Sequence, residues 1–339
     1  MKIVVGLGSI DEYIKFAEAG ADEFFCGYVP YSWSQKYGTV LPLNRREVLC
    51  YNVQLGAFSE LEILSGMMKK YEKPVHLTFN SLYYIPEQYP EIAGIISQCI
   101  KIGFHSYIIA DPALMVYLRE NGINCEIHLS GECGEINSQM VASLVKMRLK
   151  RVIFHRKNTF EDMKAVVDKC GKKDGTEGVP EFEAFVLNEM CQFTGAFCNS
   201  LHCDEMGYLC KVPYQIGTLK TGNAGSEIFN QEINGGHLLP DGFVPDDFHS
   251  LHDFSYDSAG YLCGETGCGL CALYQLKQAG ITHLKLVGRG NYTDYMEKDI
   301  RNLRMALNIL RESVDEMEFR RKLKLQIFPS GCSKNCYYR

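Results

Sequence analysis

Short apolar runs alternate with amphipathic stretches along most of the chain. In the first unit, the β-type run Lys2–Val5 leads to a stretch with apolar residues at helical spacing, Ile10–Ala17. Ser9 fits an N-cap for this helix and Gly20 a C-cap. Further strands are predicted at Glu23–Cys26, Val75–Phe79, Ser106–Ala110, Cys125–Leu129, Arg151–Phe154 and Phe182–Leu187.

Helices are predicted between these strands, at Leu61–Lys70, Tyr89–Ile102, Ala113–Glu120, Asn137–Met147 and Phe160–Cys170. Strands that alternate with helices of this size imply an α/β protein with a parallel sheet. Six or more such units favour a closed (β/α) barrel of the TIM type, although the pattern alone also allows an incomplete or distorted one.

The alternation fails between residues 213 and 261, a stretch rich in Gly, Asn, Asp and His. A loop this long within a compact domain is usually a lid or an irregular insertion. Order returns with a helix at Leu270–Gln278, a strand at His283–Val287 and a charged helix at Asp294–Glu318. We therefore predict a single barrel domain over residues 1–325, with an irregular insertion at about 211–262, and a cysteine-bearing C-terminal tail over 326–339.

The charge balance and hydropathy limit the partners and the location. A net charge of −6 gives no global basic field, so nucleic-acid binding would need a local patch. The N-terminal apolar run is too short for a signal peptide, and no stretch reaches the roughly 18 apolar residues of a membrane span. A cytoplasmic protein without a membrane span is expected.

Cysteine is abundant, with fifteen in 339 residues. In a reducing compartment, metal or iron–sulfur ligation explains them better than disulfides. Four follow the strand Phe182–Leu187 at intervals of seven, five and seven residues: Cys191, Cys198, Cys203 and Cys210. An iron–sulfur cluster needs four sulfurs about a compact centre. Zinc is the competitor, but only Cys268 and Cys271 have the Cys-x2-Cys spacing common in zinc sites.

Polar residues stand at or just beyond the ends of the predicted strands, where the chemistry of a barrel is found. Asp111, Ser130 and His155 are among them, and Asp111 before Pro112 is equally typical of a helix cap. His128 could instead point into the barrel core, given the alternation along its strand. We predict that one cavity is lined by Asn80, His128, Glu132, Arg156, Lys285 and Arg289.

Several segments resemble, in order and spacing, the collagenase-like peptidase family U32. They are GSIDEYIKFAEAGADEFFCGY, FNSLYY, IIADPALM, EIHLSGECGEINS, RVIFHRKNTFEDM, EAFVLNEMCQFTGAFCNS and CALYQLKQAGITHLKLVGR, within residues 3–310. The most specific piece is a Glu-x-Phe followed by two cysteines seven apart, here Glu183, Phe185, Cys191 and Cys198.

The resemblance implies a (β/α) barrel that carries a 4Fe–4S cluster. Its ligands would be Cys191, Cys198, Cys210 and Cys271, with Cys203 as an alternative to Cys210. Characterised relatives hydroxylate tRNA or ribosomal RNA bases, or take part in ubiquinone hydroxylation, without dioxygen, and prephenate is the associated oxygen donor. Other members are described as peptidases or collagenases.

The function suggested is an oxygen-independent hydroxylase, or a subunit of one, acting on an RNA base, a quinone precursor or a peptide. Arg156, Lys285 and Arg289 could hold the carboxylates of the donor. The alternatives are a peptidase, for which no HExxH or G-x-S-x-G motif is found, and a non-catalytic iron–sulfur scaffold in a complex. A paralogous or complex subunit is a possible partner.

Two short-spaced cysteine pairs remain after the first cluster is assigned. Glycine, serine and asparagine surround the thiols of the tail SGCSKNCYYR, and the tail has no apolar periodicity that would explain buried cysteines. A second metal site, iron–sulfur or zinc, is predicted to hold the tail to the Cys263 loop through Cys263, Cys268, Cys332 and Cys336.

Overall fold

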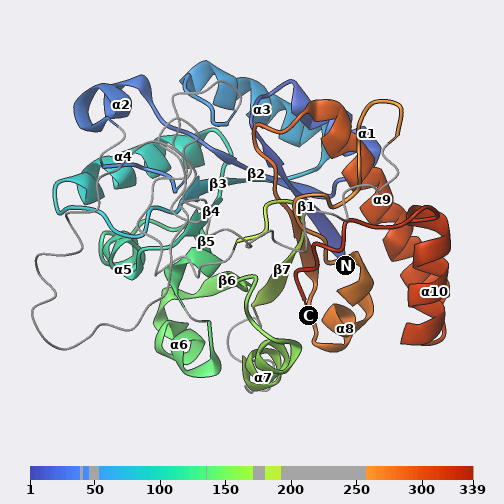
Figure 1. The fold of residues 1–339 in the computed structure, drawn as a ribbon. Helices are drawn as coiled ribbons and strands as arrows, with labels where there is room; N and C mark the ends of the chain where they lie inside the picture. The colour runs from blue at the N-terminus through green and yellow to red at the C-terminus, as the bar shows by residue number, and fades with distance from the viewer. Residues whose placement is uncertain (39–40, 46–52, 135, 171–179, 192–256, 339) are drawn as a thin grey trace, which may run out of the picture.

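Eight parallel strands form a closed barrel in which each strand pairs with the next and β8 pairs with β1 (Figure 1). The computed structural model describes residues 1–38, 41–45, 53–134, 136–170, 180–191 and 257–338. The strands are β1 Lys2–Leu7, β2 Glu23–Gly27, β3 Val75–Phe79, β4 Ser106–Ile109, β5 Glu126–Leu129, β6 Leu149–Ile153, β7 Glu181–Leu187 and β8 His283–Leu286. The predicted TIM-type barrel is confirmed, and it is complete.

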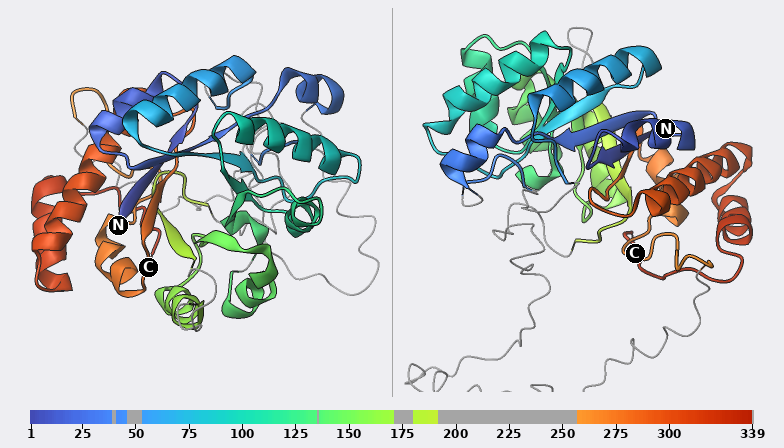
Figure 2. Two further views of the ribbon diagram at one scale, coloured as in Figure 1. Left: turned by 180° about the vertical axis from the view of Figure 1, so that it is seen from behind. Right: turned by 90° about the horizontal axis from the view of Figure 1, so that it is seen from above.

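Helices surround the barrel (Figures 1 and 2). The α-helices are α1 Glu12–Ala19, α2 Tyr31–Tyr37, α3 Phe58–Tyr71, α4 Gln88–Lys101, α5 Pro112–Glu120, α6 Ser138–Ser143, α7 Phe160–Cys170, α8 Leu273–Gln278, α9 Thr293–Glu312 and α10 Glu316–Ile327. The described residues also include the 3-10 turns η1 Gly131–Cys133, η2 Val145–Met147 and η6 Leu270–Ala272. The pairing register shifts between Ile127 and His128 where β5 pairs with β6, and between Phe185 and Leu187 where β7 pairs with β8.

The prediction of one charged helix over Asp294–Glu318 is wrong, because the first helix, α9, ends at Glu312 and a second helix follows. Ser313 is extended, with φ −99° and ψ 135°. Asp315 then starts α10, its side chain accepting a hydrogen bond from Glu318 N at 2.8 Å, while Glu318 accepts one from Val314 N at 2.8 Å. These reciprocal bonds satisfy amides that would otherwise lack partners at a helix start. The break lets α10 pack back against α9 and α8.

Other boundaries also differ from the prediction. The helix expected at Asn137–Met147 ends at Ser143 and continues only as the turn η2. Ser9 is not the N-cap of α1. That position is Asp11, and the Glu12 carboxylate accepts from Gly8 N at 2.8 Å instead. The C-cap at Gly20 is confirmed, with φ +118°. Helix α2 was not predicted from the sequence.

Two apolar layers are separated by the strands. Residues that face outward from the barrel join the helices in the main core, and alternate residues face inward. The inward set forms a separate apolar collar: Val4, Phe25, Ile108, Ile153, Phe185 and Val287. This collar lies between a charged barrel interior and the mouth at the C-terminal strand ends.

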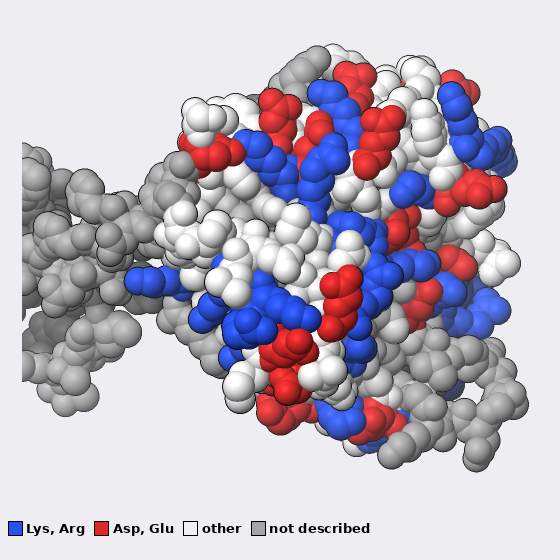
Figure 3. Space-filling model, turned by 90° about the vertical axis from the view of Figure 1, so that its right-hand side faces the viewer, with Lys and Arg blue, Asp and Glu red and all other residues white. Residues whose placement is uncertain are grey.

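The outer face over α9 and α10 is charged and mixed in sign (Figure 3). Pairs four residues apart join Arg301 to Glu297 at 3.6 Å, Arg320 to Glu316 at 2.7 Å and Lys322 to Glu318 at 2.9 Å. These charged pairs lie on a face that is open to solvent. Within the described residues, no helix combines the length and apolar character needed to cross a membrane.

Candidate functional site

A pocket opens at the C-terminal ends of the strands, above the apolar collar. Five of the six residues predicted for a cavity line it, and the sixth, His128, does not. The charged and amide side chains of the lining are Arg45, Asn80, Glu132, Arg156, Glu189, Lys285 and Arg289. Strand-end positions on β3, β6 and β8 and the turns after β5 and β7 therefore contribute to one mouth.

Asn80 positions a residue that the sequence did not indicate. Its side-chain oxygen accepts a hydrogen bond from Arg45 N at 3.1 Å, which holds the loop after Leu43 against the mouth. The Arg45 guanidinium then lies 3.5 Å from the Glu132 carboxylate. Arg45 follows no predicted strand, so its sequence position gave no signal of a place in the site.

Arg289 is given space by two glycines in neighbouring strands. A Cβ atom on Gly6 would lie 3.0 Å from Arg289 Cγ, and one on Gly27 would lie 2.9 Å from its Nη1. An alanine at either position would require the Arg289 side chain to shift, so the two glycines leave room for Arg289 where it lies at the mouth. The Arg289 guanidinium carbon is 5.8 Å from the centre of the Phe25 ring. Arg289 is 6% exposed, so its charge is directed at the pocket and not at bulk solvent.

Arg156 is buried against the collar with its guanidinium carbon 3.9 Å from the centre of the Phe185 ring. Burial opposes its charge, but Tyr337, Glu132 and Cys191 offset this electrostatically, so the pKa of the guanidinium is raised. Among the described residues its Nε has no hydrogen-bond partner. A buried donor without a partner is costly, and an anion in the pocket would satisfy it.

Lys285 is already paired. Its ammonium donates to Glu183 at 2.8 Å and lies 3.7 Å from the centre of the Phe25 ring. Burial lowers the pKa of Lys285, and Glu183 only partly offsets this. Burial alone would raise the pKa of Glu183, but Lys285 and Arg151 lower it to about 2. Lys285 therefore serves first as the partner of Glu183, and the arginines are the better candidates for carboxylate clamps.

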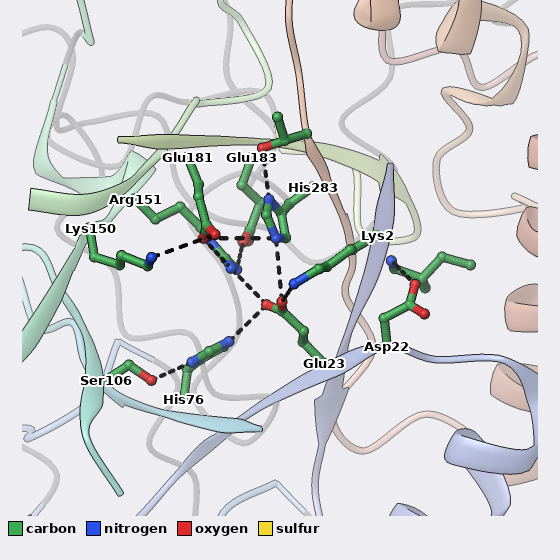
Figure 4. Close-up of polar contacts among 12 residues, drawn as sticks. Lys2, Asp22, Glu23, His76, Ser106, Lys150, Arg151, Glu181, Glu183 and His283 are labelled. Carbon is green, nitrogen blue, oxygen red and sulfur yellow. Dashed lines mark hydrogen bonds and ion pairs between the residues drawn. The ribbon is translucent and has the colours of Figure 1, made fainter. Parts of the chain in front are cut away.

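Below the collar, the barrel interior is filled by an ionic network (Figure 4). The Arg151 guanidinium lies 2.7 Å from Glu23, 2.7 Å from Glu181 and 2.8 Å from Glu183. Glu23 also meets Lys2 at 2.8 Å and His76 at 3.0 Å, and lies 3.4 Å from His283. These carboxylates are enclosed with cations from other strands, which offsets the cost of burying them.

His128 lies in this interior and not in the pocket. Its ring centroid is 4.5 Å from that of His76, and it is 1% exposed. Burial, with the nearby His76 and Arg151, lowers the pKa of His128 well below 6.5. The other strand-end residues also differ in role. Ser130 lines the pocket, whereas Asp111 caps α5, accepting from Ala113 N at 2.8 Å and from Tyr89 at 2.9 Å.

Only part of the predicted cluster lies in the described residues. Cys191, four residues beyond the end of β7, and Cys271, in η6, are both half-buried. The remaining candidate ligands, Cys198, Cys203 and Cys210, lie outside the described residues, as does most of the insertion at 211–262. Within the described ranges, no three His, Cys, Asp or Glu side chains are grouped so that they could hold a metal ion.

Glu189 is the second lining residue that sequence reasoning missed. It follows β7 by two residues, in the turn that leads to Cys191, and has a positive φ of 52°. The same strand-end position that marked the other residues could have found it. With Arg45, it makes the pocket a mixed site in which two carboxylates accompany four cations. Such a lining suits an anionic ligand that also carries polar groups.

The family model for peptidase family U32 matches residues 8–339. The protein is an eight-stranded (β/α) barrel with a polar, arginine-rich mouth. The chain belongs to peptidase family U32. No curated protein matches the chain.

The chain is similar to several solved structures at low sequence identity. The U32 peptidase Mk0906 is 11% identical, with 55% of this chain and 69% of that chain covered and a TM-score of 0.40. A conserved protein from Enterococcus faecalis is 9% identical, with 90% and 66% covered and a TM-score of 0.41. A glycerophosphodiester phosphodiesterase from Parabacteroides distasonis is 14% identical, with 56% and 84% covered and a TM-score of 0.38. Similarities this low carry no conclusion about activity.

Proposed function

We propose that this U32 protein is an iron–sulfur enzyme that hydroxylates an organic substrate without dioxygen, using a carboxylate-bearing oxygen donor of the prephenate type. The observation that supports it is the buried Arg156 guanidinium in the pocket at the mouth, whose Nε has no hydrogen-bond partner among the described residues. The strand β7, whose residue Phe185 lines the same pocket, leads to Cys191, the first thiol of the Cys191–Cys210 stretch. Anion binding and thiolate ligation would therefore meet at one place.

Arg156 and Arg289 would bind the donor. Both residues line the pocket, Arg156 after β6 with its guanidinium carbon 3.9 Å from the centre of the Phe185 ring, and Arg289 after β8 with its guanidinium carbon 5.8 Å from the centre of the Phe25 ring. Bidentate pairing to carboxylates gives arginine both strength and orientation. The apolar collar beneath them excludes water from one side, which strengthens the ion pairs.

The cluster would be held by Cys191 and Cys198, completed by Cys210 or Cys203 and by Cys271. When bound, an iron–sulfur cluster held by four thiolates supplies one-electron transfer. The half-buried Cys191 follows β7 at the end of the barrel where the pocket opens, which is the place this role requires.

The proposed reaction balances without an external oxidant. The carbon–oxygen bond of the donor breaks and a carbon–oxygen bond to the substrate forms, while the hydrogen lost by the substrate is taken up by the donor carbon. The substrate is oxidised by two electrons and the donor is reduced by the same two. An RNA base, a quinone precursor and a peptide side chain are the candidate substrates.

Peptide hydrolysis is the second candidate, and family membership together with the carboxylates Glu132 and Glu189 in the pocket favours it. One carboxylate would activate water and the other would protonate the leaving amine. Cleavage of a denatured protein substrate by the pure enzyme, abolished in Glu132→Gln and Glu189→Gln and retained in Cys198→Ala, would favour hydrolysis over the first proposal.

The test of the first proposal combines iron analysis with donor binding. Protein purified without oxygen should contain a 4Fe–4S cluster, which Cys191→Ala and Cys198→Ala should remove while Cys99→Ala and Cys170→Ala keep it. Prephenate should bind at least ten-fold more weakly to Arg156→Ala and Arg289→Ala, with Arg301→Ala on the outer face as control. Colourless protein, or unchanged binding in both arginine variants, would overturn the proposal. Turnover of the substrate by the isolated protein separates an enzyme from a scaffold.

A further inference from the structure

The last residues of the chain fold back onto the turn that precedes α8. Cys268 N donates to Asn335 O at 2.7 Å, and Tyr337 N donates to Cys268 O at 2.9 Å. Cys268 pairs with Cys336 in a parallel bridge, and it also pairs with Leu187 at the end of β7. The tail is therefore joined, through Cys268, to the strand whose end leads to the mouth.

Side chains strengthen this attachment. Ser333 of the tail donates to Gly264 O at 2.7 Å. Tyr338 donates to Phe185 O at 2.7 Å. Phe185 belongs to the apolar collar and lines the pocket. The tail is thus held on the barrel at both ends of this segment, and its last hydrogen bond is made to a residue of the pocket wall.

Two glycines make room for the consecutive tyrosines of the tail. A Cβ atom on Gly267 would clash with Tyr337 Cε1, and one on Gly269 would lie 3.1 Å from Tyr338 Cε2. Side chains at these two positions would displace the tyrosine rings from where they lie. The Gly-Cys-Gly sequence around Cys268 therefore matches the Cys-Tyr-Tyr sequence of the tail that pairs with it.

Tyr337 lies beside the arginine at the mouth. Its ring packs on the apolar collar, and the centre of the ring is 6.0 Å from the Arg156 guanidinium carbon. The same carbon is 3.9 Å from the centre of the Phe185 ring. The Arg156 guanidinium therefore has two aromatic neighbours, one on β7 and one on the tail. Burial raises the pKa of the Tyr337 phenol, so its ring stays neutral beside the cation.

Arg156 needs such neighbours to keep one orientation. It lies three residues beyond the end of β6, and its Nε has no hydrogen-bond partner among the described residues. A long side chain loses rotamer freedom when it is held in one geometry, so other contacts have to offset that loss. A guanidinium within about 6 Å of an aromatic ring centre is attracted by the ring, most strongly where water is excluded.

We propose that Tyr337 is a positioning residue of the anion site, whose ring, together with that of Phe185, orients the Arg156 guanidinium toward the pocket. This inference rests on the anion-binding role proposed for Arg156. Tyr337 is not among the described residues that line the pocket, so it acts through Arg156 and not on the ligand. The C-terminal tail is then a part of the site, although it follows no barrel strand.

Titration of the full-length protein with prephenate tests the proposal. Tyr337→Leu keeps an apolar contact with the collar but removes the ring, and it should bind prephenate about five-fold more weakly than the wild type. Tyr337→Phe, which restores the ring, should bind as the wild type does. Tyr292→Leu is the control, since Tyr292 is a 78% exposed tyrosine after β8. Equal affinity in Tyr337→Leu and a wild type that binds prephenate would overturn the proposal.

Nitrogen-15 spectra of arginine-labelled protein give a measurement that needs no donor. The Arg156 Nε–H signal, identified by its loss in Arg156→Lys, should shift and exchange faster with water in Tyr337→Leu and should be restored in Tyr337→Phe. Arg119 Nε, which donates to Met147 O at 3.0 Å, is the internal reference for an intact fold.

The two measurements separate this inference from the proposed function. An unchanged Arg156 signal in Tyr337→Leu would overturn the positioning role of Tyr337, whatever the affinity for prephenate. A changed signal in a protein that binds no prephenate would support the positioning role and count against the proposed donor alone.

Discussion

Buried ionisable side chains in this barrel hold their protonation states because other strands supply their surroundings. Glu183 stays charged because Lys285 and Arg151 reach it at 2.8 Å each. His128, whose ring centroid is 4.5 Å from that of His76 in the same interior, is kept neutral by burial. Glu183 on β7 and His128 on β5 are separated by β6, and both have a lowered pKa, so each stabilises the folded protein less as the pH falls.

The buried neutral histidine should make stability depend on pH. The pKa of His128 is lowered well below 6.5 in the folded protein, so the unfolded chain binds more protons as pH falls. The stability it contributes is therefore complete above pH 6.5 and is lost below it, by about 1.4 kcal/mol per pH unit.

Urea unfolding at pH 7.5 and at pH 5.5 measures this effect. His128→Leu should lose less stability between the two values than the wild type, while His105→Gln, at an exposed position, should behave as the wild type. Equal losses in the wild type and in His128→Leu would show that His128 does not remain neutral in the barrel. His76 contributes to the residual slope, because burial lowers its pKa as well.

At the scale of elements, the break between α9 and α10 depends on local capping. Both helices have amphipathic patterns, and Val314 between them is exposed. The periodicity alone therefore continues across the break. Two hydrogen bonds mark the start of the second helix. The Glu318 amide donates to the Asp315 carboxylate, and the Val314 amide donates to the Glu318 carboxylate.

Removing this cap should destabilise the helical hairpin. Asp315→Ala leaves the Glu318 amide without its side-chain acceptor and should cost about 1 kcal/mol in the free energy of unfolding. Asp294→Ala, at an exposed position in the first turn of α9, should cost less. Chemical denaturation compares the free energies of unfolding of the two variants. An equal loss in both would mean that the Asp315 cap does not stabilise α10.

At the scale of the whole molecule, the closed barrel encloses charges that only the complete ring can balance. Arg151 on β6 joins Glu23 on β2 to Glu181 and Glu183 on β7, across the barrel interior. The apolar collar separates this network from the pocket above. The barrel thus carries one balanced charge system inside and an arginine-rich one at its mouth.

Loss of the central cation should be severe. Arg151→Met would remove the cation that Glu23, Glu181 and Glu183 share and should cost about 3–5 kcal/mol in the free energy of unfolding. Lys150→Met, which removes a half-exposed cation 3.8 Å from Glu181, should cost less than about 1 kcal/mol. Urea denaturation compares the free energies of unfolding of the two variants with that of the wild type. A small loss in Arg151→Met would mean that the network does not stabilise the barrel.

The prediction of the barrel needed only the sequence, because alternation with periods of 2 and 3.6 residues is a local property. The strands from β1 to β8 and the polar residues at their ends follow from it, and Asn80, Glu132, Arg156 and Arg289 are found together for that reason. The cysteine cluster after β7 remains a prediction of the sequence.

Tertiary structure decided what the local pattern could not. Arg45 reaches the mouth through a hydrogen bond to Asn80, and Lys285 is taken by Glu183, because both contacts join residues far apart in the chain. The same holds for the tail, which lies beside Cys268 through backbone bonds that no periodicity records. Sequence pattern fixes which residues face inward, whereas the closing of the ring and the return of the tail fix which partners they meet.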